Sequence, residues 1–384
     1  MLRRLAWSAL AAIGVLGLYL AAWPVPIEPV AWQAPPNPGH SGSFAQNTRL
    51  EAVERLDLGG LHGPEDVAVD AQGRLYASTA EGWIVRLQPD GSHAEPWVST
   101  GGRPLGLDFD AAGRLVVADA FRGLLSIAAD GTVTQLAAAA DGVPIRYADD
   151  VDVAKDGRIY FSDASVKFGA QDAGNTLAAS LLDLMEHGGH GRLLVFDPVA
   201  GRATVLASGI NFANGVAVSP DQAFVLVNET GSYRVLRVWI AGPRAGLVEP
   251  LAEGLPGFPD NISVGLDGRF WVALVSPRDA VLDRMAGRPF LRKVVQRLPA
   301  SLRPGPKAYG HVIAIDRQGT IVADLQDPRG GYPLITSAVE TRDHLYLGSL
   351  VASSVGRVPR ARLDSVLPRG PRGPAAGGRQ PGAR

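Results

Sequence analysis

A module of about 40–46 residues recurs along this chain from Leu50 onward, and the repeat limits the fold more than any other feature. Each copy contains a short apolar strand, a tight turn that often holds Gly-Arg, and a second apolar strand. Copies cover residues 66–76, 106–117, 150–161, 216–228 and 262–274, and the last unit has two versions, 311–319 and 338–350. A repeat of this length is typical of a β-propeller blade. We therefore predict an all-β fold, a six-bladed β-propeller over residues 48–360, since a β-sandwich would not explain the sustained period.

Two intervals between modules are longer than the others because each contains a helical pattern. In residues 176–187, Leu177, Leu181, Leu184 and Met185 recur at helical spacing, and residues 278–298 show the same spacing with a break at 287–289. We therefore predict two short helical insertions. Basic residues surround the apolar stripe of the second one: Arg278, Arg284, Arg288, Arg292, Lys293, Arg297 and Arg303. This pattern fits either a lid packed on the propeller or a lid that contacts a membrane and admits apolar substrates.

The two ends of the chain differ from its repeated part. Residues 5–23 carry no charge and follow Arg3 and Arg4, which predicts a single-pass transmembrane signal anchor, with residues 1–4 in the cytoplasm and the propeller on the exported side. A cleaved signal peptide and a buried helix are the alternatives, although residues 19–23 lack a clear cleavage site. Residues 24–47 are rich in Pro, Gly and Ser, as linkers are, and the Arg/Gly/Pro-rich residues 361–384 are expected to be disordered.

The composition excludes several kinds of chemistry. The chain has no cysteine, so it has no disulfide, thiolate nucleophile or zinc-thiolate site. A formal net charge of −1 gives no reason to expect nucleic-acid binding. No Gly-x-Ser-x-Gly sequence is present, so the serine triad of the α/β-hydrolases has no support.

Polar residues stand at the start of four modules, where a propeller would direct its inner strands at the central channel. Any one of them fits a turn, since Asp and Asn are ordinary turn residues. Buried carboxylates that face each other, however, need a cation, and Ca²⁺ takes six to eight oxygen ligands. We predict a site for Ca²⁺ or another divalent cation with four side-chain ligands: Glu65, Asp149, Asn214 and Asp260. Asn261 or water would complete the coordination shell.

Several motifs resemble the strictosidine synthase-like family, and the match spans about residues 50–360 in the right order. They include 63–67 (Gly-Pro-Glu-Asp-Val), 102–106 (Gly-Arg-Pro-Leu-Gly), 147–151 (Tyr-Ala-Asp-Asp-Val), 254–261 (Gly-Leu-Pro-Gly-Phe-Pro-Asp-Asn) and 344–350 (His-Leu-Tyr-Leu-Gly-Ser-Leu). The resemblance implies a six-bladed propeller with an N-terminal anchor. The family's wider relatives, the gluconolactonases and paraoxonases, are Ca²⁺-dependent lactonases and esterases. Their ligand positions fall on Glu65, Asn214 and Asp260, and paraoxonase-type ligands add Asp149 and Asn261.

The chain departs from the family's pattern at the catalytic glutamate of the synthase. Thr336 stands there, next to Ser337, so the strictosidine synthase condensation is not expected, and both residues are predicted to bind substrate instead. Glu340 is expected to be a solvated edge residue. The paraoxonase histidine pair has no counterpart either. We expect His311 to be structural, and the two histidines beside the first insertion to be exposed in a loop: His187 and His190.

Metal-assisted hydrolysis is the function that this set of residues suits best. A central Ca²⁺ would polarise an ester or lactone carbonyl, and an adjacent carboxylate, Asp149 or Asp150, would take a proton from water. We therefore expect a Ca²⁺-dependent esterase or lactonase that acts on small molecules. A non-catalytic ligand-binding or scaffold propeller is the alternative, and turnover on a panel of esters and lactones distinguishes the two.

Overall fold

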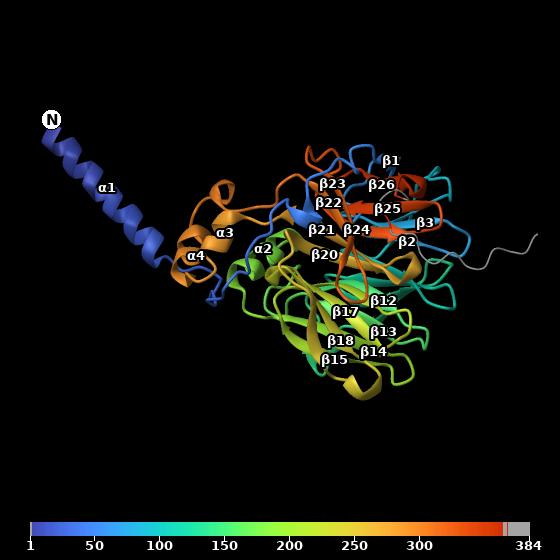
Figure 1. The fold of residues 1–384 in the computed structure, drawn as a ribbon. Coiled ribbons are helices and arrows are strands. Elements are labelled where there is room, and N and C mark those ends of the chain that lie inside the picture. The colour runs from blue at the N-terminus through green and yellow to red at the C-terminus, as the bar shows by residue number, and fades with distance from the viewer. Residues whose placement is uncertain (1, 364–366, 368–384) are drawn as a thin grey trace, which may run out of the picture.

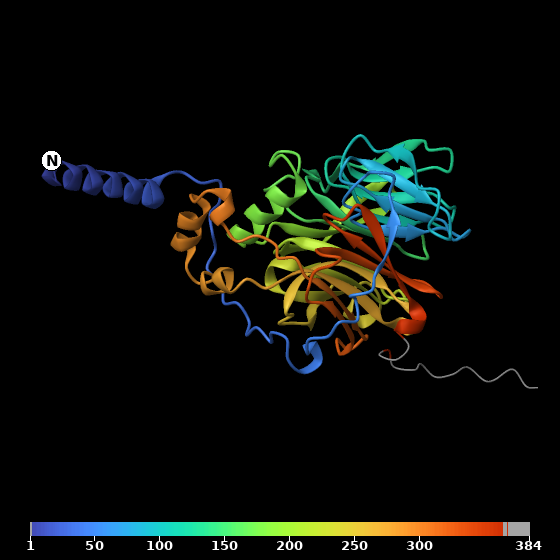
Figure 2. The same cartoon turned by 90° about the horizontal axis from the view of Figure 1, so that it is seen from above.

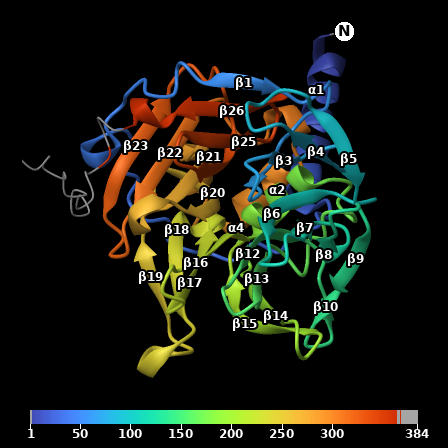
Figure 3. The same ribbon diagram turned by 90° about the vertical axis from the view of Figure 1, so that its right-hand side faces the viewer.

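Six β-sheets, antiparallel except for one short parallel pair at the outer edge of the third blade, form a ring around a central axis in the computed structural model, which describes residues 2–363 and 367 (Figure 3). The predicted six-bladed propeller is therefore confirmed. In each blade one strand lines the axis and the next strands pack outward from it. The first blade contains β2 (Val67–Val69), β3 (Leu75–Ser78), β4 (Trp83–Leu87) and β5 (Glu95–Ser99). The second contains β6 (Pro104–Phe109), β7 (Leu115–Asp119), β8 (Gly123–Ile127) and β9 (Val133–Ala137). The third contains β12 (Ala148–Val153), β13 (Ile159–Asp163), β14 (Gly191–Asp197) and β15 (Arg202–Ile210).

The remaining blades complete the ring, and the two ends of the repeated region share the last one. In that blade β1 (Glu54–Asp57) pairs antiparallel with β26 (Ser354–Pro359), with Leu56 opposite Val355, so the ring is closed by hydrogen bonds. Short strands β10 (Ala139–Ala140) and β11 (Val143–Pro144) extend the outer edge of the third blade. The fourth blade contains β16 (Ala213–Val218), β17 (Phe224–Glu229), β18 (Arg234–Trp239) and β19 (Val248–Ala252). The fifth contains β20 (Gly257–Val264), β21 (Phe270–Pro277), β22 (Gly310–Ile315) and β23 (Ile321–Asp327). The sixth contains β24 (Ile335–Glu340), β25 (His344–Ser349) and β26 (Ser354–Pro359), together with β1.

Of the two sequence segments that were predicted as versions of the last unit, one lies in the fifth blade. Residues 311–319 do not begin a blade; they lie in β22, the third strand of the fifth blade, and the turn after it. The second insertion separates β22 from β21, so this strand resembles the start of a new unit in the sequence. The version at 338–350 does lie in the inner strand pair of the sixth blade.

Carboxylates join adjacent blades near the axis. Asp66 accepts a hydrogen bond from the backbone amide of Leu107 at 2.9 Å, and Asp150 accepts one from Val216 at 2.7 Å. Asp108 and Asp152 bind amides of the next blade in the same way. Since a buried backbone amide without an acceptor is destabilising, these carboxylates explain why the inner strands of a packed ring carry so many acidic residues.

The helical insertions lie together on one face of the propeller, which we call the helix face (Figure 1). Helix α2 (Thr176–Glu186) connects β13 to β14, and α3 (Ala280–Arg284) and α4 (Pro289–Gln296) lie between β21 and β22. The register explains the shared face: Asp163, before α2, pairs with Ala148 at the start of β12, and Pro277, before α3, pairs with Gly257 at the start of β20. Both insertions therefore lie over the first residues of the inner strands.

The N-terminal region combines an isolated helix with an ordered segment. Helix α1 (Leu2–Ala22) extends away from the helix face and is long and apolar enough to cross a membrane (Figures 1 and 2). Residues 24–47, predicted to be a linker, form a strap that packs first along the insertions and then along the fifth blade. Ile27 is fully buried, and the amides of Val30 and Trp32 donate to the carbonyls of Glu186 and Ala286 at 2.9 and 3.1 Å.

The remaining elements are short 3₁₀ helices in loops, and the packed region extends slightly beyond residue 360. Leu363 and Leu367 are buried against the last blade, whereas residues 364–366 and 368–384, most of the tail predicted to be disordered, lie outside the described residues. The 3₁₀ helices are η1 (Gly42–Phe44), η2 (Thr230–Ser232), η3 (Gly242–Arg244), η4 (Leu266–Gly268), η5 (Ala300–Leu302) and η6 (Arg360–Arg362).

Candidate metal centre and its pocket

The predicted ligands lie where the inner strands begin, below the helix face. Each ligand is at most 6% exposed. The strand pairing shifts register between Ala148 and Val151 in β12, and similar shifts occur in β16 and β20. A β-bulge bends a strand and re-aims its side chains. The bulges bracket the predicted ligands of these three strands: Asp149, Asn214, Asp260 and Asn261.

A glycine lets two of these bulges approach each other. A Cβ atom on Gly215 would lie 2.4 Å from the backbone nitrogen of Ile262 and 2.6 Å from the carbonyl oxygen of Asp260. Only a residue without a side chain fits at this distance. Gly215 therefore brings Asn214 of the fourth blade against Asp260 of the fifth.

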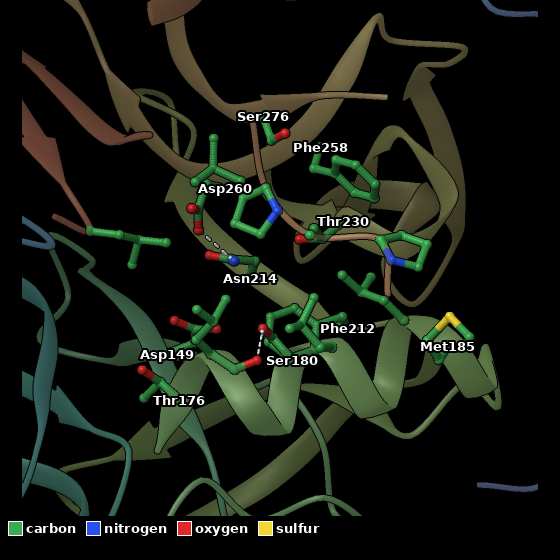
Figure 4. Close-up of a pocket in the computed structure, with 18 of the residues that line it drawn as sticks. Asp149, Thr176, Ser180, Met185, Phe212, Asn214, Thr230, Phe258, Asp260 and Ser276 are labelled. Atoms are coloured by element: carbon green, nitrogen blue, oxygen red, sulfur yellow. Dashed lines mark hydrogen bonds between the residues drawn. The ribbon is translucent and has the colours of Figure 1, made fainter. Parts of the chain in front are cut away.

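Hydrogen bonds between blades connect four of the five predicted ligands. Asn214 Nδ2 donates to Asp260 Oδ1 at 2.6 Å, and Asn261 Nδ2 donates to Glu65 Oε1 at 3.0 Å. Figure 4 shows Asp149, Asn214 and Asp260 together on one side of the pocket. The structure thus brings together all five residues that were predicted as ligands, from four of the six blades.

Sequence analysis missed a sixth polar residue in this group. Asn228, at the end of β17, is fully buried, and its Nδ2 donates to the carbonyl oxygen of Asp260 at 2.5 Å. The signal in the sequence is an amide that directly follows the apolar run 224–227. A polar side chain at a buried strand position needs a partner, and that requirement could have identified it.

Five buried oxygen atoms in this group have no hydrogen-bond partner: Glu65 Oε2, Asp149 Oδ2, Asn214 Oδ1, Asn228 Oδ1 and Asn261 Oδ1. Buried polar atoms are nearly always paired, and a bound cation would supply a partner for this cluster of acceptors. Carboxylate and amide oxygens without histidine or cysteine suit Ca²⁺ better than zinc. Within residues 2–363 and 367, no group of three or more His, Asp or Glu side chains has metal-site spacing. Any coordination shell in this group would have to include the amide oxygens.

The carboxylates of this group are held in an environment that disfavours their charge. Burial raises the pKa of Glu65 well above its usual range, and the charges of Asp260 and Asp149 raise it further. Burial, followed by the charge of Asp260, also raises the pKa of Asp149. Burial raises the pKa of Asp260 to about 7, against the smaller opposing effect of the Asn214 hydrogen bond. A bound cation would remove this penalty because it favours the ionised form of all three.

An apolar pocket with a cavity volume of about 110 Å³ lies between the carboxylates and the helical insertions. Figure 4 shows Phe212, Phe258 and Met185 opposite the polar group. A few hydroxyl groups, including those of Ser180 and Thr230, also line the pocket. Such a combination of apolar walls and a small polar group is typical of a small-molecule site. The other apolar residues of its wall include Leu105, Leu181, Leu184, Val275 and Leu282.

Four predicted site residues do not line this pocket, and one of them is Asn261, which lines a separate cavity farther along the channel. The Asp150 carboxylate accepts hydrogen bonds from the amides of Val216 and Val151, and with Ser337 it lines a separate cavity farther along the channel. Thr336 is fully buried, and its Oγ1 donates to the carbonyl oxygen of Glu65 at 2.6 Å. These positions give no support to Asp150 as the base or to Thr336 and Ser337 as substrate-binding residues, because blade packing occupies the side chains or turns them away.

Two expectations about individual side chains are wrong. Glu340 is not solvated: its side chain is fully buried and accepts hydrogen bonds from Trp271 Nε1 and the Leu266 amide, with Arg269 and Arg360 as ion-pair partners. The histidines beside the first insertion are not exposed loop residues. His187 stacks on Trp32 of the strap at 3.9 Å, and His190 Nε2 lies 2.7 Å from Glu186 Oε1.

The environment of His311 fits the structural role that was expected for it. His311 is 1% exposed, and its Nε2 lies 3.0 Å from Asp324 Oδ2 in the outer part of the fifth blade.

The fold and site define a class of protein: a six-bladed β-propeller with carboxylates and amides gathered at its axis. Solved structures share the fold. A gluconolactonase from Xanthomonas campestris has a TM-score of 0.59 at 19% identity and covers 86% of this chain and 97% of its own. Regucalcin, a calcium-binding protein from Agrobacterium tumefaciens, has a TM-score of 0.55 at 16% identity and covers 80% of this chain and 93% of its own.

Sequence comparison identifies the family within this class. The strictosidine synthase-like N-terminal model matches residues 42–87, and the strictosidine synthase model matches 149–243. Strictosidine synthase-like 6 from Arabidopsis thaliana is 36% identical over 316 residues, which is 80% of this chain and 82% of that protein. Adipocyte plasma membrane-associated protein from Bos taurus is 32% identical over 375 residues, 91% of this chain and 89% of that protein. The chain belongs to the strictosidine synthase-like family.

Proposed function

We propose that this protein is a Ca²⁺-dependent hydrolase of esters or lactones, with the metal at the propeller axis. The observation that carries the proposal is the group of five unpaired buried oxygen atoms, three of which belong to residues that line the apolar pocket: Glu65, Asp149 and Asn214. The neighbours in fold add support, since they include a gluconolactonase, a luciferin-regenerating enzyme and a calcium-binding regucalcin.

Glu65, Asp149, Asn214, Asp260 and Asn261 would hold the cation, with Asn228 as a further oxygen donor. Bound there, Ca²⁺ would polarise the substrate carbonyl and stabilise the negative charge that develops on its oxygen. The amides of Asn214 and Asn261 hold the carboxylates of Asp260 and Glu65 in place through hydrogen bonds. The apolar wall around Phe212 and Phe258 positions the rest of the substrate and excludes bulk water.

Asp149 is the carboxylate best placed to accept a proton from the attacking water. Among the described residues it receives no hydrogen bond on its carboxylate, whereas Glu65 and Asp260 each receive one from an asparagine. The proton would pass from water to Asp149 as the hydroxide adds to the carbonyl carbon, and Asp149 would return it to the alkoxide oxygen as the ester C–O bond of the tetrahedral adduct breaks.

Metal content combined with turnover tests the proposal. The purified protein should contain Ca²⁺ and hydrolyse members of a panel such as phenyl acetate and γ-lactones, and EDTA should abolish turnover until Ca²⁺ is restored. Asp149→Asn should reduce turnover by at least about 100-fold with the fold retained. Bound Ca²⁺ without hydrolysis of any substrate would instead support a ligand-binding or scaffold propeller.

The location of the protein is a separate part of the proposal. Helix α1 fits a signal anchor, and the relatives include proteins named for association with the adipocyte plasma membrane. We place α1 across the membrane as a single span, with the propeller on the exported side because Arg3 and Arg4 precede the span. The full chain should stay in the membrane fraction after an alkaline wash and retain its N-terminal residues by mass spectrometry; release of the propeller would indicate a cleaved signal.

A further inference from the structure

Exposed apolar side chains concentrate on the helix face around the pocket opening. On the second insertion, Val281, Phe290 and Leu302 are 50%, 57% and 65% exposed. Leu177 of α2 both lines the pocket and is 42% exposed, so it lies at the rim. Scattered apolar residues on a protein surface are normal, but a cluster beside a pocket indicates an interaction surface.

Two positive charges on the same insertion lack a partner. Arg284 and Arg288 are exposed, and no described residue forms an ion pair or side-chain hydrogen bond with either. The other basic residues of the insertion are engaged with carboxylates or backbone carbonyls: Arg278 with Asp283, Lys293 with Glu28, Lys307 with Asp279, and Arg292, Arg297 and Arg303 with carbonyl oxygens. The free charges therefore complement a negatively charged surface.

Helix α1 is attached to this insertion. The buried guanidinium of Arg297, directly after α4, donates to the carbonyls of Leu20 and Trp23, and Tyr19 Oη donates to the carbonyl of Arg297 at 3.1 Å. These bonds satisfy carbonyls at the end of α1, where a positive charge also complements the helix dipole. If α1 crosses a bilayer, α4 must then lie at the bilayer surface, and Figures 1 and 2 show that α1 leaves from the helix face.

We propose that the helix face rests on an anionic lipid bilayer, with the exposed apolar residues inserted among the headgroups, and that the pocket takes lipid-like esters or lactones directly from the membrane. The rim residues Leu177, Gly305 and Pro306 are exposed on this face and also line the pocket. An apolar substrate would then move from the acyl region into the apolar pocket without crossing water. The substrate class rests on the proposed hydrolase function, whereas the membrane contact does not.

The membrane contact can be measured without any turnover, because the chain has no cysteine. Full-length single-cysteine variants Phe290→Cys and Leu302→Cys carry an environment-sensitive fluorophore in proteoliposomes. Val199→Cys is the control: Val199 is 97% exposed in the β14–β15 turn, at the blade end opposite the insertions. Nitroxide-labelled lipids should quench the dye at positions 290 and 302 and leave that at 199 unquenched. Equal, weak quenching at all three positions in vesicles that hold α1 would overturn the proposal.

Lipid composition and substrate distinguish the remaining outcomes. Quenching at position 290 should be stronger in vesicles that contain phosphatidylglycerol than in vesicles of phosphatidylcholine alone. The double variant Arg284→Gln with Arg288→Gln should remove that increase, and no response to anionic lipid overturns the charge part of the proposal.

The double variant Phe290→Ser with Leu302→Ser should reduce hydrolysis of a long-chain ester in vesicles by at least about tenfold and leave hydrolysis of a soluble short-chain ester unchanged. Equal rates for wild type and variant on the long-chain ester overturn membrane delivery. Failure of wild type on both esters, with quenching intact, overturns the hydrolase function only.

Discussion

At the scale of single residues, the bulge in β12 gives two adjacent carboxylates different roles. Asp149 lies in the pocket with an unpaired Oδ2, whereas Asp150 accepts hydrogen bonds from Val216 of the next blade and from Val151. One residue along a strand changes the face that a side chain occupies. We therefore expect Asp149 to serve hydrolysis and Asp150 to serve the packing of the ring.

A matched pair of variants tests this division of roles. Asp150→Ala leaves two backbone amides without an acceptor, which should lower the free energy of unfolding by about 2–4 kcal/mol. Its turnover per folded molecule should stay within about twofold of wild type. Asp149→Asn should show the reverse: a loss of turnover, with metal-free stability equal to or above that of wild type because a buried charge is removed. Denaturant unfolding in EDTA and single-substrate kinetics check both; a loss of turnover confined to Asp150→Ala would contradict the assignment.

Asn228 allows a second prediction at this scale. Asn228→Ala removes an unpaired oxygen and the hydrogen bond to the Asp260 carbonyl, so the affinity for Ca²⁺ should fall by about 10–100-fold. Asn211→Ala is the control, because Asn211 in the same blade binds Glu229 and has no unpaired buried atom. Calorimetric titration of the EDTA-treated protein with Ca²⁺ measures both. Equal affinities for the two variants would exclude Asn228 from the metal centre.

At the scale of elements, one arginine holds the helix face together. Arg292 of α4 is 1% exposed and donates to the carbonyls of Met185 and Glu186 in α2, Met285 and Ala286 after α3, and Val30 in the strap. A planar guanidinium with five donors can bind this many carbonyls at once, and an ammonium cannot. The insertions and the strap therefore form one layer over the pocket.

Arg292→Lys should loosen this layer even though the charge is kept. We expect the free energy of unfolding to fall by about 2–4 kcal/mol, because several buried carbonyls lose their donor. Lys293→Ala, which removes only a surface pair with Glu28, should cost less than about 1 kcal/mol. Hydrogen exchange of residues 285–296 provides a local readout and should increase only in Arg292→Lys. Equal protection in both variants would show that Arg292 does not organise the layer.

The features that could be predicted depend on residues close together in the sequence, whereas those that could not be predicted depend on contacts between residues far apart. The period of the modules and the position of Glu65, Asn214 and Asp260 at their starts were enough to predict the ring and the convergence of these side chains near its axis, because both depend on a local pattern repeated in order. The packing of the strap was not predictable: it depends on pairs such as Val30 with Arg292, 262 positions apart. Glu340 looked like an edge residue for the same reason, since its partners Arg269 and Trp271 lie in another blade.

At the scale of the whole molecule, the axial group couples blades that are otherwise joined mainly to their neighbours. Glu65, Asp149, Asn214 and Asp260 belong to the first, third, fourth and fifth blades. A cation bound by all four would act as a cross-link at the centre of a ring that β1 and β26 close at its edge. Ca²⁺ should therefore stabilise the entire propeller rather than a single loop.

The pH dependence of this stabilisation follows from the direction of the pKa shifts. Without metal, burial raises the pKa of Asp260 from 3.8 to about 7, and also raises the pKa values of Glu65 and Asp149. Between about pH 4 and pH 7 the folded state thus binds more protons than the unfolded state, so metal-free stability should fall as pH rises. Ca²⁺ competes with these protons, and its stabilising effect should be larger at pH 8 than at pH 5.

Melting temperatures in EDTA and in Ca²⁺, measured at pH 5 and pH 8 for wild type and Asp260→Asn, test this prediction. In EDTA the variant should be more stable than wild type, and by a wider margin at pH 8, because it lacks a carboxyl group that must ionise while buried. In Ca²⁺ the order should reverse at pH 8, since the variant has lost a charged ligand. A wild-type melting temperature that does not respond to EDTA at either pH would mean that no cation links the blades at the axis.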